Sequence, residues 1–251
     1  MREEIITLPK WDYEIERKMR IFGATSQQIS KKKYNIFIGV SISNKKLDEK
    51  MAYDYLKWSV KNTKEKVAVI IADELDIVNY EIFSSYSSGK SRKRAEKEGE
   101  DFKKIFERAT NRLLNKDKSK VKIYRWSDVK KSEHYQEIYK HLLKSYQEIP
   151  EFKSAVLFFV KKYVRKRGKL KILESQEKLD KLAMYILGEL PTLLQGIYLN
   201  EIHYNLCIYP TYFASGMSQF VTDIWDGELN ISKELVKKLK GKAVLVEIWL
   251  D

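Results

Sequence analysis

Three side chains have the functional groups and positions expected of a catalytic site: Ser41, Tyr185 and Glu189. Tyr185 and Glu189 are four residues apart in a stretch with helical spacing, so their polar ends share one face and can converge. A carboxylate paired with a phenol in a sheltered cleft can hold an ammonium group and relay protons. Ser41 follows Gly39 at the end of an apolar run and is a candidate nucleophile. Taken singly, each feature also fits a purely structural role.

The elements that would position these groups form a βαβ unit. Residues 34–40 are an apolar run with the length and β-branched content of a buried strand. Residues 47–62 have apolar side chains spaced by three and four, which predicts an amphipathic helix. Residues 66–72 are a second apolar run, typical of a parallel strand covered on both faces. Ligands of open α/β sheets bind beyond the carboxyl ends of strands, which is where Ser41 falls.

The rest of the chain continues the α/β pattern without an internal repeat or a low-complexity linker. We therefore expect a lead-in over residues 1–33 and a single α/β domain over residues 34–251, with a mostly parallel central sheet flanked by helices. Pro191 is expected to end the last long helix. The further predicted helices are 77–86, 90–114, 131–148, 151–167 and 175–189, and the further predicted strands are 121–126, 204–209 and 242–249.

The formal net charge of +13 indicates a polyanionic partner, although lysine-rich composition can also reflect genome bias. Cations gather at the start of the predicted helix 90–114, where they oppose the helix macrodipole. They either contact a phosphate backbone or form a solvated face. A second basic cluster, 161–167, falls at a predicted helix C-terminus, where the dipole favours it. The cations of the first cluster are Lys90, Arg92, Lys93, Arg94 and Lys97.

Several function classes are excluded by composition. The single cysteine, Cys207, rules out an internal disulfide, and with three histidines it leaves few metal ligands. The N-terminal residues lack the pattern of a signal peptide, and no apolar run approaches the roughly 20 residues of a membrane span. We expect a soluble, cytoplasmic protein with no metal. The absence of Gly-x-Gly-x-x-Gly and of a P-loop argues against a mononucleotide-binding protein.

The order of Gly39-Val40-Ser41, the basic helix, Tyr185 with Glu189 and Pro191, and then Tyr209-Pro210 resembles the cyclodipeptide synthases. The resemblance spans roughly residues 34–212. These enzymes make 2,5-diketopiperazines from two aminoacyl-tRNAs. The resemblance implies a Rossmann-like fold, similar to the catalytic domain of class I aminoacyl-tRNA synthetases. It also implies two aminoacyl-tRNA partners, no cofactor, and a monomer.

The resemblance assigns a role to each matching residue. Ser41 would be the nucleophile that takes the first aminoacyl group as an ester, and Tyr185 and Glu189 would hold its amino group. Tyr209 would position groups and transfer protons in the second half-reaction. The cations between Lys90 and Lys97 would bind tRNA. The candidates for substrate binding are Phe37, Gly39, Asn44 and Pro210.

The chain departs from the family pattern at three positions. Asn35 stands where a histidine is usual, Phe37 where an aliphatic residue is commoner, and Asn44 coexists with Tyr209-Pro210 although the family pairs Asn with Tyr-Gln. Two alternatives remain for the group that activates Ser41: the ribose hydroxyl of the tRNA substrate and the tyrosines. The alternative function is a non-catalytic tRNA- or RNA-binding module of the same architecture.

Overall fold

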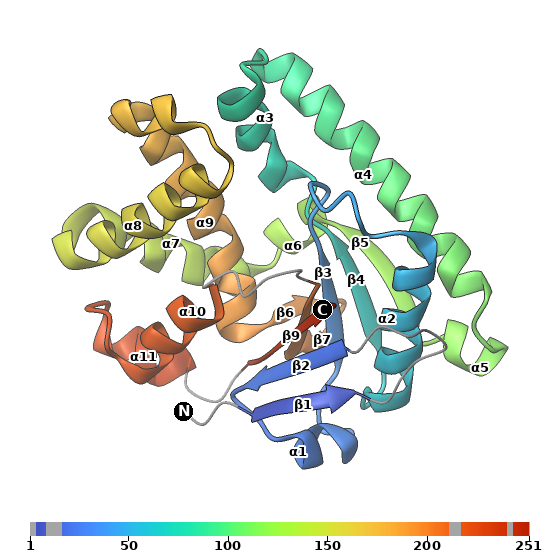
Figure 1. Ribbon diagram of the computed structural model, residues 1–251. Helices are drawn as coiled ribbons and strands as arrows, with labels where there is room; N and C mark the ends of the chain where they lie inside the picture. The colour runs from blue at the N-terminus through green and yellow to red at the C-terminus, as the bar shows by residue number, and fades with distance from the viewer. Residues whose placement is uncertain (1–3, 9–16, 211–216, 240–242, 251) are drawn as a thin grey trace.

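The main sheet of this computed structural model has a largely parallel core with an antiparallel hairpin at one edge (Figure 1). The structure describes residues 4–8, 17–210, 217–239 and 243–250. In chain order, the strands of the sheet in these residues are β1 (Glu4–Leu8), β2 (Arg17–Phe22), β3 (Ile36–Val40), β4 (Val67–Ile71), β5 (Val121–Arg125), β8 (Leu206–Pro210) and β9 (Val244–Leu250). Their spatial order is β1-β2-β9-β8-β3-β4-β5, and every pairing from β9 to β5 is parallel. The expected mostly parallel sheet is confirmed.

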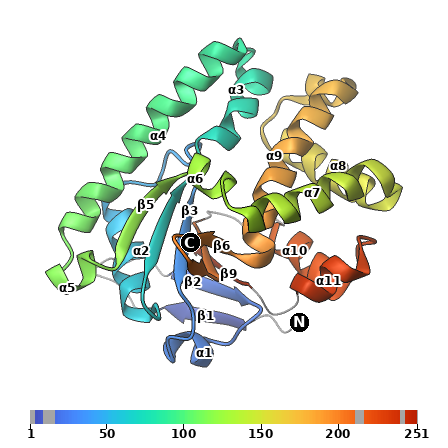
Figure 2. The ribbon, with the colours of Figure 1, turned by 180° about the vertical axis from the view of Figure 1, so that it is seen from behind.

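Helices cover both faces of this sheet (Figures 1 and 2). Helices α2 (Glu49–Asn62) and α4 (Ser88–Asn111) pack on one face, and the other face shares a hydrophobic core with the helices between Glu133 and Leu239. A two-stranded hairpin of β6 (Ile197–Leu199) and β7 (Ile202–Tyr204) lies outside the main sheet. The helices of the described residues are α1 (Ser26–Ser30), α2 (Glu49–Asn62), η1 (Glu74–Asp76), α3 (Ile77–Ser84), α4 (Ser88–Asn111), α5 (Asn115–Lys118), α6 (Trp126–Lys130), α7 (Glu133–Glu148), α8 (Pro150–Lys166), η2 (Leu170–Glu174), α9 (Gln176–Gln195), α10 (Met217–Asp226) and α11 (Lys233–Leu239). None of them is both long and apolar enough to cross a membrane.

Strand β3 is apolar on both sides because it has a hydrophobic core on each face. Ile36, Ile38 and Val40 pack with α2 and α4, whereas Phe37 points into the core formed with α7 to α11. The parallel neighbours of β3 are β4 and β8. Because parallel strands end at the same edge of a sheet, the carboxyl ends of β3, β4 and β8 lie side by side.

Asn35, one of the departures from the family pattern, holds the opposite end of β3. Its amide Nδ2 donates to the carbonyl of His203 at 3.3 Å, and its Oδ1 accepts from the backbone N–H groups of Glu65 and Lys66 at 3.0 Å. These bonds join the start of β3 to the residues that enter β4 and β8. The Asn35 side chain is therefore a structural clamp at the amino edge of the sheet, away from Ser41.

Two expectations about element boundaries differ from the structure. Strands β1 and β2, within the segment expected to be a lead-in, belong to the main sheet because β2 pairs with β9. The expectation that Pro191 ends a helix is wrong, since α9 continues to Gln195 with Pro191 inside it. Leu193 and Leu194 beyond the proline are almost fully buried, and their burial outweighs the one backbone hydrogen bond that proline removes. The helix stops at Gly196, whose φ is +77°.

Gly99 sets how closely α4 approaches the sheet, and its replacement by alanine tests this packing. A Cβ at this position would lie 2.8 Å from Cβ of Asp73 and 2.9 Å from a guanidinium nitrogen of Arg125. Alanine in a helix interior normally stabilises by about 1 kcal/mol relative to glycine. We expect Gly99→Ala instead to lower the free energy of unfolding by about 1–3 kcal/mol, because overpacking displaces α4. Urea denaturation measures the change.

Gly89→Ala is the matched control in the same helix, since nothing lies within 4 Å of a Cβ placed there. It should leave the free energy of unfolding unchanged or raise it slightly. Equal effects of the two substitutions would contradict the close-packing explanation.

Candidate active site

Seven of the predicted site residues line one small cavity at the carboxyl edge of the sheet. The cavity has a volume of about 50 Å³. Strand β3 and the residue after it supply one wall, α9 supplies a second, and the end of β8 supplies a third. The predicted residues that the structure brings together there are Phe37, Gly39, Ser41, Tyr185, Glu189, Tyr209 and Pro210.

A larger cavity of about 420 Å³ shares Tyr185, Glu189 and Tyr209 with the first. Phe159 and Tyr163 of α8 add aromatic surface to its lining. Tyr163 also stacks on Tyr185, with ring centroids 6.0 Å apart. Tyr185 and Glu189, the pair predicted from helical spacing, thus line both cavities. The two adjoining cavities could together receive two small groups.

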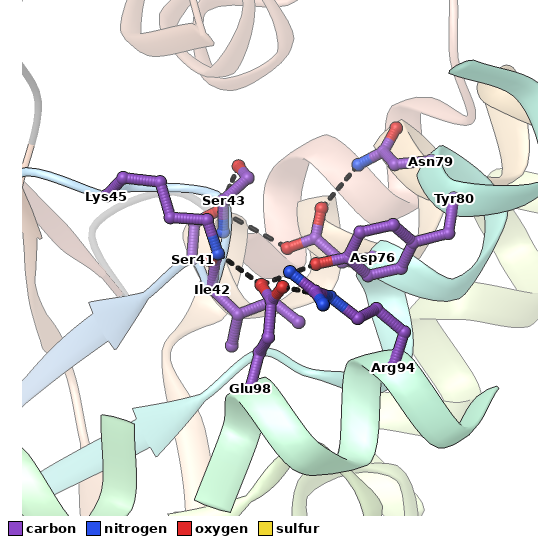
Figure 3. A network of polar contacts seen from close by, with 9 residues as sticks. All are labelled: Ser41, Ile42, Ser43, Lys45, Asp76, Asn79, Tyr80, Arg94 and Glu98. Atoms are coloured by element: carbon purple, nitrogen blue, oxygen red, sulfur yellow. Dashed lines mark hydrogen bonds and ion pairs between the residues drawn. The ribbon is translucent and has the colours of Figure 1, made fainter. Parts of the chain in front are cut away.

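Ser41 lies in a polar turn directly after β3. Its Oγ is 2.8 Å from Oγ of Ser43 and donates to Oδ2 of Asp76 at 3.4 Å (Figure 3). The backbone N–H of Asn44 closes the turn on the Ser41 carbonyl at 3.1 Å. Asn44, predicted to bind substrate, is absent from the lining of both cavities and shapes the turn instead.

Asp76 is a buried carboxyl group that the sequence analysis did not include. It is the last residue of η1, and only 2% of its surface is exposed. Burial raises the pKa of Asp76 to about 6, and the pKa stays that low because of a hydrogen bond from Asn79, the positive charge of Arg167 and a hydrogen bond from Ser41. Asn79 Nδ2 donates to its Oδ1 at 2.6 Å, so both carboxylate oxygens are engaged.

Glu189 is the second buried carboxyl group of the site. Burial raises its pKa to about 7; a hydrogen bond from Tyr209 lowers it, and the negative charge of Asp76 raises it further. Among the described residues, Oε2 of Glu189 has no hydrogen-bond partner. Burial and the charge of Glu189 raise the pKa of Tyr185 and of Tyr209, so both phenols keep their protons. An ammonium group placed here would stabilise the Glu189 carboxylate.

Glu98 joins the basic helix to the turn that carries Ser41. Its carboxylate accepts hydrogen bonds from Lys45 of the turn, from Arg94 of α4 and, at 2.6 Å, from the Tyr80 hydroxyl of α3 (Figure 3). Burial disfavours the charged form of Glu98, but the hydrogen bonds from Lys45 and Tyr80 outweigh burial, and its pKa lies below the ordinary value. Arg94, predicted to bind tRNA, is therefore already engaged within the protein.

The other four cations predicted to bind nucleic acid are exposed on the first turns of α4. Figure 1 shows these turns next to α3, beyond the edge of the sheet. Lys90 lies over the Tyr86 ring, with Nζ 3.9 Å from its centroid. A second group of exposed cations, Lys162, Lys166 and Arg167 of the 161–167 cluster, lines the larger cavity.

Comparisons with known proteins show the family to which the chain belongs. Residues 18–222 match the family model described as cyclodipeptide synthase. The chain belongs to the cyclodipeptide synthase family. It is 24% identical over 234 residues to the cyclo(L-leucyl-L-leucyl) synthase of Staphylococcus haemolyticus, a match that covers 92% of this chain and 94% of the relative. The family membership makes the chain an enzyme.

Solved structures of the cyclodipeptide synthase family share the fold. A Mycobacterium tuberculosis structure, reported to demonstrate that cyclodipeptide synthetases are related to type I tRNA synthetases, aligns with a TM-score of 0.68 at 16% identity over 94% of each chain. The cyclodipeptide synthase of Candidatus Glomeribacter gigasporarum bound to Phe-tRNAPhe aligns with a TM-score of 0.53 at 14% identity, over 85% of this chain and 86% of that one. The Rossmann-like fold expected from the resemblance is confirmed.

Two features of this cyclodipeptide synthase were missed although the sequence carried a signal for them. Asp76 follows the end of β4, the strand next to β3, so the rule that ligands bind beyond carboxyl ends could have included it. Ser43 is a second serine in the same turn, two residues after Ser41. Tyr163 had no such signal, because only the packing of α8 against α9 brings it to Tyr185.

The raised pKa of Glu189 predicts a stability effect that depends on pH. Because its folded pKa of about 7 lies above the unfolded value of 4.5, this carboxyl group stabilises the fold at low pH, and that stability is lost as the pH rises through 7. Glu189→Gln keeps the shape and an acceptor for Tyr209 but cannot ionise. We expect the free energy of unfolding of the variant, relative to the wild type, to be higher at pH 8 than at pH 4.5, by up to about 3 kcal/mol.

Urea denaturation at the two pH values measures this difference. Glu174→Gln is the control, because Glu174 is exposed, and its effect should be the same at both pH values. A pH-independent effect of Glu189→Gln would contradict the raised pKa.

Proposed function

We propose that this enzyme condenses the aminoacyl groups of two aminoacyl-tRNAs into a cyclic dipeptide through an ester on Ser41. The observation that carries the proposal is the convergence of Ser41, Tyr185, Glu189 and Tyr209 on one cavity. A serine hydroxyl, a buried carboxyl group and two protonated phenols are the groups that acyl transfer to and from an amino acid requires.

The first half-reaction exchanges one ester for another. Ser41 Oγ attacks the carbonyl carbon of the first aminoacyl-tRNA, the bond to the ribose oxygen breaks, and the aminoacyl group stays on Ser41. Because an aminoacyl-tRNA is already an activated ester, this exchange is nearly neutral in free energy and needs no ATP. Glu189 and Tyr185 hold the ammonium group of the bound amino acid.

The second half-reaction needs neutral amino groups as nucleophiles. The amino group of the aminoacyl unit on Ser41 attacks the ester carbon of the second aminoacyl-tRNA, and the bond to its ribose oxygen breaks, which releases the tRNA and leaves a dipeptidyl ester on Ser41. The free amino group of this dipeptide then attacks the Ser41 ester, which closes the ring and releases the Ser41 hydroxyl. Glu189, with a pKa of about 7, is matched to exchange protons with an amino group near neutral pH. Tyr209, which hydrogen-bonds to Glu189, continues that proton path.

The lining of the smaller cavity favours an apolar amino acid as the first substrate. Beyond the reactive edge, its walls are apolar or aromatic side chains except for Thr192, whose hydroxyl donates to the backbone carbonyl of Glu189. A charged or strongly polar side chain would lose its hydration there without a partner. The residues concerned are Phe37, Ile70, Ala72, Trp126, Leu193, Ile197 and Cys207.

Two cationic surfaces support tRNA as the carrier of the aminoacyl group. The exposed cations of α4 begin beside α3, and Lys162, Lys166 and Arg167 line the larger cavity. Exposed lysine and arginine side chains bind phosphate groups without reading the bases. The backbone of the acceptor arm would lie against these surfaces while its aminoacyl end enters the cavity.

Replacing Ser41 tests the covalent intermediate. Wild-type protein mixed with radiolabelled aminoacyl-tRNA should carry an acid-stable labelled ester and release a cyclic dipeptide detectable by mass spectrometry. Ser41→Ala should show neither, because it has no nucleophilic oxygen. Ser84→Ala, at an exposed serine at the end of α3, is the matched control and should behave as the wild type.

A labelled adduct of normal yield on Ser41→Ala would overturn the serine ester. Binding of tRNA by the wild type without any cyclic product would instead favour the non-catalytic RNA-binding function.

Replacing the exposed cations of α4 tests the tRNA surface. The triple variant Arg92→Ala/Lys93→Ala/Lys97→Ala should bind tRNA more weakly and lower the slope of log affinity against log salt by about 3. Filter binding over a salt series measures both. Lys33→Ala/Lys61→Ala/Lys116→Ala removes the same charge at exposed positions outside α4 and is the control. Equal losses in the two triple variants would show that only net charge matters.

A further inference from the structure

The hydrogen bonds around Ser41 define where its proton points. The hydroxyl of Ser41 has one proton, and Oγ donates it to Oδ2 of Asp76 at 3.4 Å. Oγ of Ser43, 2.8 Å away, is the donor in its contact with Ser41 when the Ser41 proton lies on the bond to Asp76. The backbone N–H of Ser43 also donates to Ser41 Oγ, at 3.4 Å. In the described part of the chain, Asp76 is thus the acceptor for the Ser41 proton.

Asp76 is held in place by groups from several elements. Asn79 of α3 fixes its other oxygen at 2.6 Å. The positive charge of Arg167, the residue directly after α8, favours the carboxylate. The guanidinium of Arg167 is itself placed over the rings of Phe83 and Tyr163, at 4.9 and 4.8 Å from their centroids. A buried carboxylate with a fixed orientation and a serine proton directed at it has the arrangement of a general base.

We propose that Asp76 is the general base that removes the proton from Ser41 during acylation, an inference that rests on the proposed role of Ser41 as nucleophile. As the Oγ–carbonyl carbon bond forms, the Ser41 proton passes to Oδ2 of Asp76. The bond between the acyl carbon and the ribose oxygen then breaks. The departing ribose oxygen takes up a proton, and Asp76 returns to the carboxylate when it gives its proton up. Ser43, which donates to Ser41 Oγ, orients the attacking oxygen.

The other candidate bases are placed less well. Tyr185 and Tyr209 remain protonated, because burial raises the pKa of both, so they can donate but not accept the Ser41 proton near neutral pH. Glu189 receives its hydrogen bond from Tyr209 rather than from Ser41. His203 is turned toward the carbonyl of Gln195, 2.7 Å from its Nε2.

The ionisation of Asp76 fits this role. With a pKa of about 6, it is mainly a carboxylate at neutral pH and is basic enough to take a proton. Acylation should therefore slow as the pH falls through 6. The groups that face Asp76 are Ser41 from the turn, Asn79 and Tyr80 from α3, Glu98 from α4, Tyr163 from α8, Arg167 directly after α8, and Tyr185 and Glu189 from α9.

Single-turnover acylation of Ser41 by radiolabelled aminoacyl-tRNA, measured between pH 5 and 7.5, tests the proposal. Asp76→Asn keeps the shape of the side chain but removes the base, so its acylation rate at pH 7 should fall about 10²–10⁴-fold. The component of the rate profile centred near pH 6 should also disappear, whereas the component that comes from Glu189, whose pKa is about 7, should remain. Glu74→Gln, which removes a carboxylate from the same short helix, is the control and should acylate as the wild type.

Asn79→Ala provides a second readout that does not require replacing Asp76. The hydrogen bond from Asn79 lowers the pKa of Asp76, so its loss should move the midpoint of the rate profile to higher pH. The plateau rate above the midpoint should change much less. A role for Asp76 in folding alone would not move this midpoint, so Asn79→Ala remains decisive even where Asp76→Asn unfolds.

The failure of this inference is distinct from failure of the proposed function. Wild-type rates and an unshifted pH profile in both variants would overturn Asp76 as the base and leave Ser41 as the nucleophile. They would point to a base supplied by the substrate, such as the ribose hydroxyl. Absence of any labelled ester on the wild type would instead remove the proposed function on which the inference rests.

Discussion

The Glu98 carboxylate is the interaction on which the geometry of the site depends. It is a buried anion that receives donors from three separate segments: Lys45 after β3, Tyr80 in α3 and Arg94 in α4. Each segment carries something the site needs, namely the turn of Ser41, the helix that follows Asp76, and the exposed cations. A buried carboxylate without these partners would be strongly unfavourable, so the three segments keep one relative placement. The position of the nucleophile is thereby linked to the surface proposed to meet tRNA.

Asp76 and Glu189, the two buried carboxyl groups of the site, have different hydrogen-bond partners and neighbouring charges. Asp76 has Asn79, Arg167 and Ser41 to favour its charge, whereas Glu189 has Tyr209 and a more apolar environment. Asp76 therefore ionises at lower pH than Glu189. Removing a proton from a hydroxyl and holding an amino group that must later lose its proton are different requirements, and the different hydrogen-bond partners of the two carboxyl groups, Ser41 for Asp76 and Tyr209 for Glu189, fit them to these proposed roles.

The sequence predicted the parts of this enzyme that local pattern determines. The runs 34–40 and 66–72 were predicted as buried strands from their length and β-branched content, and both are strands of the parallel sheet. Four-residue spacing correctly placed Tyr185 and Glu189 on one face. The prediction that Pro191 ends a helix was wrong, because the burial of Leu193 and Leu194 beyond it, a tertiary effect, decides where α9 ends. The strands before residue 33 were missed because their partner β9 lies at the far end of the sequence. Arg94 could not be separated from its basic neighbours, since its pairing with the carboxylate of Glu98 appears only in three dimensions.

The position of β9 between β2 and β8 also has a consequence for synthesis on the ribosome. The β1–β2 hairpin leaves the exit tunnel early, but the strand that joins it to the sheet is translated last among the described elements. At typical elongation rates, the hairpin waits roughly ten seconds or more for its partner. During that interval both the hairpin and β8 expose an unpaired edge that can pair with another nascent chain. Cotranslational folding of this protein must therefore leave two sheet edges open until β9 has been translated.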